Sequence, residues 1–310
     1  MKLKEKIDFK YNLSVYYSIL KKYLFIFIVL LFNSFLIEAS LSGDKYLFKL
    51  VIDKGTDFIS GKMVHADFLR YLSVLTVIFL AIVAYRAAAK WLHVHLLVKM
   101  EASMILDLKR RFFNHLLFLD YDFHATHKSG TMISRLSRGS RAIENMTDTL
   151  VFQFATLIFQ VIVVSLSMAY IHWVLALTIL AIVLLFIGYS FFIEVVQQSY
   201  NMEANKAEDS EKGLISDVFT NIESIKYYGK EDIINSRYDQ ACRRSRETQV
   251  RHWNFFRWWD FGQSLILGLG TLALVYFSVT GLIEKRISLG TLVFIFTLFG
   301  NLMGPLFMFV

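Results

Sequence analysis

Residues 203–240 read EANKAEDSEKGLISDVFTNIESIKYYGKEDIINSRYDQ and form the middle of a polar arm, Phe191–Trp259, that lies between two apolar runs. No Gly or Pro occurs between Phe191 and Lys212, so nothing in the sequence stops the preceding apolar helix from continuing into water. At 1.5 Å per residue, about 25 further helical residues would carry the chain about 35 Å beyond the apolar run. We expect Gly213 and Gly229 to interrupt this arm and to leave a short aromatic elbow between them.

The whole chain has the composition of an α-helical membrane protein. Hydrophobic residues make up 55% of its 310 residues, with one Pro and one Cys, and the mean hydropathy is +0.48. Five runs are long and apolar enough to cross a bilayer, and a sixth begins near residue 289. The predicted spans are residues 23–42, 70–89, 150–170, 173–193, 261–281 and 289–310. Because the sixth span stops at Val310, we expect the sequence to be part of a longer protein.

The 33 Lys and Arg residues are distributed unevenly between the two sides of these spans. Most lie in residues 1–22, which we expect to be an amphipathic entry helix along the membrane surface, and in the loops 90–149 and 194–259. By the positive-inside rule these segments are cytosolic, in a plasma (inner) membrane. Arg86, near the cytosolic end of its span, is expected to extend its charge to the interface. The net charge of +7 therefore indicates topology and not nucleic-acid binding.

The two inner loops have a similar layout. No Gly or Pro occurs between Lys62 and Ser129, which predicts a long cytosolic extension of the second span. Gly130 and Gly139 are expected to break this first loop before the chain returns. On the other side, residues 43–62 are expected to resume a helix after the first span, and only residues 170–172 connect the third and fourth spans.

Two long cytosolic hairpins on six spans resemble the membrane domain of the ATP-binding cassette (ABC) exporters. Residues 123–136, with SRL at 134–136, resemble the family's first-loop phrase, and NIESIKYYGKED at 221–232 resembles its second-loop phrase. KYLFKLVID at 45–53 is similar to the outer extension of the first span. The resemblance implies an all-α, six-helix exporter transmembrane domain, residues 23–310, with long cytosolic helix extensions and a truncated sixth helix.

Within that family the chain resembles the mitochondrial and heavy-metal-tolerance half-transporters. This likeness rests on SRGSRAIE at 137–144, DFGQSLILGLG at 260–270 and GPLFMFV at 304–310. It implies that the fifth span begins where the subfamily holds a glutathione-like ligand. The subfamily's arginines at the cytosolic end of the fourth span are absent here, where residues 195–202 read VVQQSYNM.

The resemblance implies two sets of candidate residues. The elbows at 119–127 and 219–229 would be coupling helices seated on a nucleotide-binding domain, through Phe123, His124, Arg135, Glu223, Lys226, Tyr227 and Tyr228. Alternatively, these aromatic side chains only pack each elbow against its own arm. Cargo would be bound in a central cavity by Asp260, Gln263, Asn301 and Met303. Gln263 and Asn301 could instead bond a neighbouring helix, and Asp260 could instead pair with Arg257 or nearby lysines at the interface.

Several chemistries have no counterpart in the sequence. No G-x-x-x-x-G-K-[ST] motif occurs, so no phosphate-binding loop and no catalytic residue is expected in this chain. ATP and Mg²⁺ would belong to a nucleotide-binding domain, downstream or on a separate chain. The histidine pairs His93/His95 and His124/His127 lack the pattern of a metal site, and Cys242 stands alone.

The sequence therefore predicts the membrane-spanning part of an ATP-driven exporter. Two halves, identical or different, would enclose a central cavity, and the nucleotide-binding domains would drive alternating access through the elbows. The alternative is a membrane receptor or sensor subunit whose cytosolic arms dock a signalling partner. The cargo and the direction of transport stay open.

Overall fold

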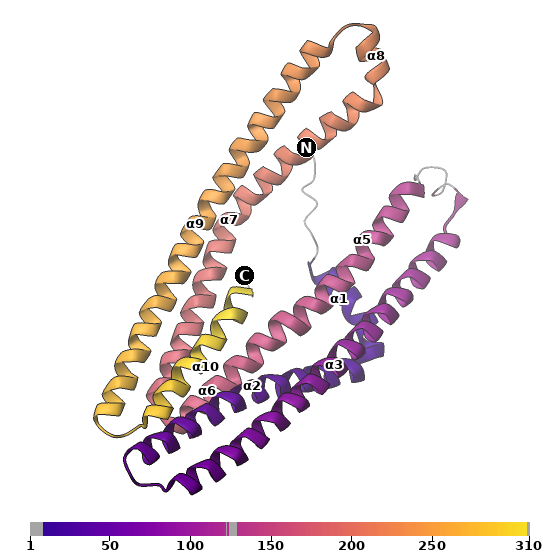
Figure 1. Cartoon of the computed structure of the whole chain (residues 1–310). Helices are drawn as coiled ribbons and strands as arrows, with labels where there is room; N and C mark the ends of the chain where they lie inside the picture. Colours follow the sequence, from indigo (N-terminus) through magenta and orange to yellow (C-terminus); the bar gives the residue numbers. More distant parts are fainter. Residues whose placement is uncertain (1–8, 122, 124–128, 309–310) are drawn as a thin grey trace. The chain divides into compact units, whose positions relative to one another are not determined.

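The computed structural model describes residues 9–121, 123 and 129–308, and among these residues it contains helices and turns but no strand (Figure 1). The chain divides into two compact units. One unit comprises Met1–Ala176 together with Phe277–Val310, and the other comprises Leu177–Tyr276. The all-α architecture predicted from the sequence is confirmed.

The first unit holds most of the helices. They are α1 (Phe9–Leu20), a 3-10 turn (Lys21–Tyr23), α2 (Leu24–Ile59), α3 (His65–Leu117), α5 (Ser129–Asp148), a π-helical segment (Thr149–Phe154), α6 (Ala155–Ile171) and α10 (Leu289–Met308). The predicted long extension of the second span is present, because α3 runs for 53 residues without a break. Only His172 separates α6 from α7 (Trp173–Thr220), as the short predicted connection requires.

Several glycines that were expected to interrupt helices do not. α5 continues through Gly139, α7 continues through Gly213, and α2 passes Gly43 without stopping, whereas α5 begins at Ser129, next to Gly130. A helical Gly costs only about 1 kcal/mol relative to Ala, which the helix formers around it can offset. The expected break does occur at Gly229, whose φ of 58° lies in the left-handed region.

The entry helix α1 is amphipathic, but part of its apolar face packs on the protein. Tyr16, Ile19 and Leu20 are each less than 10% exposed. They join a buried cluster with side chains of α2, α3, α5 and the π-helical segment. The Tyr16 hydroxyl also lies 3.0 Å from Thr147 Oγ1. This contact with the helices replaces part of the expected contact with the membrane surface.

α2 and α3 form an antiparallel hairpin whose register is fixed along its length. The contacts that fix it, from the α1 end to the turn, are Lys22–Asp107 at 2.7 Å, Asn33 Nδ2 to the Ala89 carbonyl at 2.9 Å, Asp44–Arg86, and the stacked rings of Phe58 and Phe68. The prediction that Arg86 extends its charge to the interface is therefore wrong. Its side chain is 16% exposed and pairs with Asp44, because a cation among apolar helices is stabilised by a carboxylate within reach.

The second unit is one long helical hairpin that contains most of α7, all of α8 (Ile222–Tyr227) and most of α9 (Glu231–Ile283) (Figure 1). α7 has 48 residues and α9 has 53, which corresponds to roughly 70–80 Å of helix each. Gln249 Nε2 reaches Glu208 at 3.5 Å, and the Cys242 thiol reaches Glu211 at 3.7 Å. These contacts show that the two helices stay paired far beyond their apolar parts.

Six helices among the described residues are long and apolar enough to cross a membrane. They cover Lys10–Ile59, His65–Leu117, Leu136–Ile171, Trp173–Thr220, Glu231–Ile283 and Leu289–Phe307. Each predicted span lies within one of these helices, apart from residues 308–310 at the end of the predicted sixth span. The chain thus has the helices of a multi-pass membrane protein.

Candidate functional site

The elbow between α7 and α9 is a short helix held by local contacts. α8 ends after Tyr227, and the left-handed Gly229 turns the chain into α9. Lys226 Nζ lies 3.1 Å from Glu231 Oε1 across this turn. The Glu231 carboxylate accepts a bond from its own backbone N–H and one from Lys226, and both lower its pKa below the usual 4.5. The elbow therefore has a defined shape without a core of its own.

Large side chains on this elbow face outward. Tyr227 is 85% exposed and Tyr228 is 70% exposed, with their rings in edge-to-face contact at 5.3 Å. Glu223 and Lys226 are also exposed. Clustered exposed aromatics beside charged side chains are typical of protein interaction sites. The alternative, that these tyrosines pack the elbow on its own arm, does not fit their exposure.

An apolar hollow of about 460 Å³ lies inside the elbow. It is lined by Ile215, Val218, Phe219, Ile222, Ile225, Lys226, Glu231, Ile234, Asn235 and Tyr238. Phe219 is 70% exposed at its edge. An inserted apolar side chain from a partner would find complementary surface here.

The first-loop candidates are less well placed by the structure. Phe123 is half-buried, and its backbone N–H donates to the Asp120 carbonyl at 3.1 Å. His124 lies outside the described residues. Arg135 belongs to α5, but its side chain is not among those described. Their coupling role stays a prediction.

The predicted cargo residues divide between the two units. On α9, Asp260 is exposed, whereas Gln263 is 4% exposed and donates from Nε2 to Ser190 Oγ of α7 at 2.8 Å. On α10, Asn301 and Met303 are half-buried. Gln263 thus forms the interhelical bond that was weighed as its alternative role. A cargo role for all four residues stays a prediction.

In the stretch at 195–202, the side chain that faces α9 is the neutral Gln197. Gln197 is 6% exposed, and its Nε2 donates to His252 Nδ1 at 3.3 Å. No charge at this position is available for an anionic ligand.

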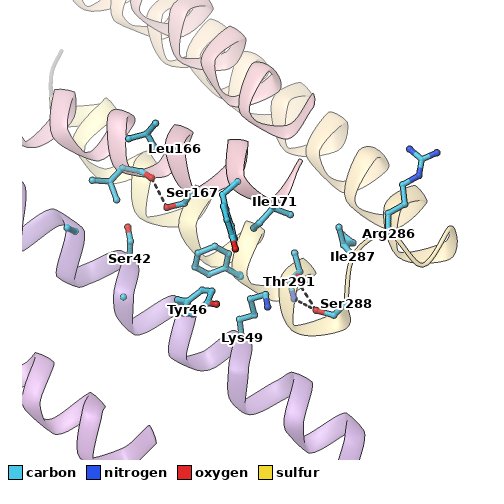
Figure 2. A pocket seen from close by; sticks show the side chains of 15 residues that line it. Ser42, Tyr46, Lys49, Leu166, Ser167, Ile171, Arg286, Ile287, Ser288 and Thr291 are labelled. Carbon is cyan, nitrogen blue, oxygen red and sulfur yellow. Dashed lines mark hydrogen bonds between the residues drawn. The ribbon is translucent and has the colours of Figure 1, made fainter. Parts of the chain in front are cut away.

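A second cavity, of about 650 Å³, lies between α2, α6 and α10 (Figure 2). It is lined by Ala39, Ser42, Gly43, Tyr46, Lys49, Val163, Leu166, Ser167, Tyr170, Ile171, Arg286, Ile287, Ser288, Thr291 and Phe294. Sequence reasoning did not find this cavity. Its residues come from three distant segments, and neither a motif nor a charge run marks it.

These features define a class of protein: a polytopic membrane domain whose paired helices extend far beyond their apolar parts and end in a short elbow with exposed aromatic side chains. The chain belongs to the ABC transporter transmembrane region family, whose model matches residues 20–306. The resemblance inferred from the two loop phrases is therefore confirmed.

Similar proteins support the same assignment. The chain is 24% identical over 210 residues to "Iron-sulfur clusters transporter ATM1, mitochondrial" of Kluyveromyces lactis, and 25% identical over 209 residues to "Iron-sulfur clusters transporter ABCB7, mitochondrial" of Homo sapiens. Each match covers 67% of this chain, but only 29% of the yeast protein and 28% of the human one. Because these relatives are mitochondrial, the expected plasma-membrane location finds no support.

The fold has a solved counterpart in "Structure of a bacterial Atm1-family ABC exporter with ATP bound". The TM-score is 0.69 at 19% identity, over 93% of this chain and 50% of that chain. The six-helix exporter transmembrane fold is thereby shown.

Proposed function

We propose that this chain is the cargo-binding and force-transmitting part of an ATP-driven exporter. A nucleotide-binding domain, following residue 310 or on a separate chain, would bind ATP and Mg²⁺ and seat the α8 elbow. Two transmembrane halves would form the working dimer. ATP-driven closure of the nucleotide-binding domains would then shift the halves between two access states.

The observation that carries this proposal is the α7–α8–α9 hairpin. Its helices stay in contact well beyond their apolar parts, through Gln249–Glu208 and Cys242–Glu211, so a push at the tip would be passed along the arm. The tip carries Tyr227 and Tyr228 exposed, which are suited to anchor in a groove of a partner. A hairpin that only docked a partner passively would not need this extended pairing.

The cargo site is proposed to include Asp260 and Gln263 of α9. Gln263 would have to exchange its bond with Ser190 for one to the cargo, which is possible because the two bonds are equivalent in kind. Gln197 supplies no positive charge, so we do not propose that a cation at this position holds the cargo.

The test uses the protein reconstituted in lipid nanodiscs with its nucleotide-binding domain. Tyr227→Ala together with Tyr228→Ala should reduce cargo-stimulated ATP hydrolysis by about tenfold, because two aromatic anchors of an interface are lost. Ile59→Ala is the control, since Ile59 is an equally exposed apolar side chain at the α2–α3 turn. Unchanged stimulation in the double variant would contradict the proposal.

A further inference from the structure

The cavity between α2, α6 and α10 has a chemistry that the proposed transport mechanism does not use. Its lining contains basic residues but no carboxylate. Figure 2 shows the Lys49 amine directed into the cavity near Tyr46 and Thr291. The lining includes the hydroxyl groups of Ser42, Ser167, Ser288 and Thr291, and a wall of apolar side chains faces them. The cavity therefore offers positive charge and hydrogen bonds beside an apolar surface.

The acidic partner of Lys49 is Asp53, which lies outside the lining and also bonds the N-terminus of α10. Asp53 accepts from Lys49 Nζ at 3.0 Å and from the Gly290 backbone N–H at 3.0 Å. The Asp53 charge is thus shared with the N-terminus of α10, where a carboxylate is favourable. Lys49 keeps two N–H donors for a ligand, and its side chain is only 18% exposed. A cation shielded in this way binds an anion more strongly than one in water does.

The helix ends around the cavity indicate its position along the membrane normal. Tyr170 and Ile171 line it at the end of α6, one residue before the connection to α7. Arg286 and Ser288 line it just before α10 begins. Turns between spans lie at the membrane boundary, where Lys, Arg and Tyr side chains are also favoured. The cavity is therefore at the headgroup level of the leaflet on the side of these turns.

We propose that this cavity binds an anionic phospholipid, with the phosphate at Lys49 and the upper acyl chain along Val163, Leu166 and Phe294. The volume is in the range of sites for drug-sized ligands, about 300–1,000 Å³, and far exceeds that of a single ion. Arg286 stands at the rim, where it pairs with Glu284 at 3.0 Å and its guanidinium is directed away from the cavity, so Lys49 is the cation that faces the ligand (Figure 2). A choline headgroup would find no carboxylate in the lining, so we expect an anionic lipid to be preferred.

The experiment is a titration of the purified chain with phosphatidylglycerol and with phosphatidylcholine, followed by native mass spectrometry. The intact protein should retain phosphatidylglycerol at least about tenfold more tightly than phosphatidylcholine, as expected for one desolvated charge-assisted contact. Lys49→Gln should remove that preference. Lys54→Gln removes the same charge about one and a half turns away, outside the lining, and should keep the preference.

Two further measurements distinguish a lipid from a soluble anion. Leu166→Trp keeps every cation but fills the apolar wall, so it should also weaken phosphatidylglycerol binding if an acyl chain lies there. Glycerol 3-phosphate, a headgroup without chains, should compete weakly. Equal binding of glycerol 3-phosphate, or no effect of Leu166→Trp, would overturn the lipid assignment in favour of a soluble anion. An equal loss in Lys54→Gln would reduce the effect to general surface charge and overturn the proposal.

Discussion

At the scale of single residues, the pair Asp44–Arg86 is the most consequential polar contact between α2 and α3. Both side chains are less than 20% exposed. Asp44→Asn should destabilise the protein by about 3–5 kcal/mol, because it leaves a buried cation without its partner. The double variant Asp44→Leu with Arg86→Leu should recover most of this loss. Thermal unfolding in detergent measures both effects.

An exposed pair in the same helix is the matched control for that prediction. Lys54 and Asp57 are each 40% exposed and 3.3 Å apart. Asp57→Asn should change the stability by less than about 1 kcal/mol. If Asp44→Asn is as mild as Asp57→Asn, the buried pair does not hold the hairpin.

Gly262 is the residue on which the close approach of α7 and α9 depends. A Cβ at this position would overlap the Tyr189 ring, whose hydroxyl is fixed by donation to the Trp258 carbonyl at 2.6 Å. Gly262→Ala should therefore destabilise by about 1–3 kcal/mol, as overpacking does. Gly268→Ala, in the same helix with nothing within 4 Å, should be neutral or slightly stabilising. Equal unfolding temperatures for the two variants would contradict this account of the contact.

Individual contacts were the part that the sequence predicted least. Arg86 was recognised as unusual within an apolar run, but its partner Asp44 lies 42 positions away and was assigned to an outer segment. The bond between Asp53 and Gly290 joins residues 237 positions apart. Such pairings depend on the register of packed helices, which no local pattern encodes.

At the scale of elements, the α2–α3 hairpin limits where the bilayer can lie. The predicted spans 23–42 and 70–89 are staggered along it, because Asn33 contacts Ala89 and Leu47 shares a groove with Phe79. The two predicted spans therefore cannot both lie within one bilayer core, which is about 20 helical residues thick. The α6–α7 connection lies near the level of Tyr46, and this level marks one face of the bilayer core.

Measured from that boundary, the bilayer should contain α3 from about residue 79 to about residue 98. Val74 and Val94 are both 52% exposed and test this directly. In a chain with Cys242→Ser, a water-soluble maleimide should label Val74→Cys and spare Val94→Cys. The span 70–89, predicted from hydropathy alone, requires labelling of Val94→Cys and protection of Val74→Cys. That result would show that residues 70–89 are the membrane span.

Long helices were predictable from the sequence where no Gly or Pro interrupts it. The chain between Lys62 and Ser129 lacks Gly and Pro, and α3 is continuous for that reason. Helix ends at Gly residues were not predictable, because Gly139 and Gly213 differ from Gly229 only in backbone conformation. That conformation is decided by the turn into α9 and not by the residue itself.

At the scale of the whole molecule, the arms of an exporter and those of a sensor subunit differ in how they respond to ATP. In an exporter dimer, nucleotide-binding domains close on ATP and carry the two α8 elbows with them. A sensor that docks a signalling partner has no such cycle. The distance between equivalent residues in two copies therefore distinguishes the two functions.

Ser224, exposed on α8, is a suitable labelling position beside the tyrosines. With Ser224→Cys spin-labelled in a Cys242→Ser chain and reconstituted as a dimer in nanodiscs, the distance between copies should shorten when ATP binds and lengthen after hydrolysis. Ile59→Cys, at the α2–α3 turn, should move in the opposite sense, because closing one side of an alternating-access dimer opens the other. If the distance between the two Ser224→Cys labels does not change when ATP binds, the sensor function is favoured. Movement of the elbow without movement at Ile59 would mean that the force stops within the α7–α9 arm, so that the paired helices bend instead of transmitting it.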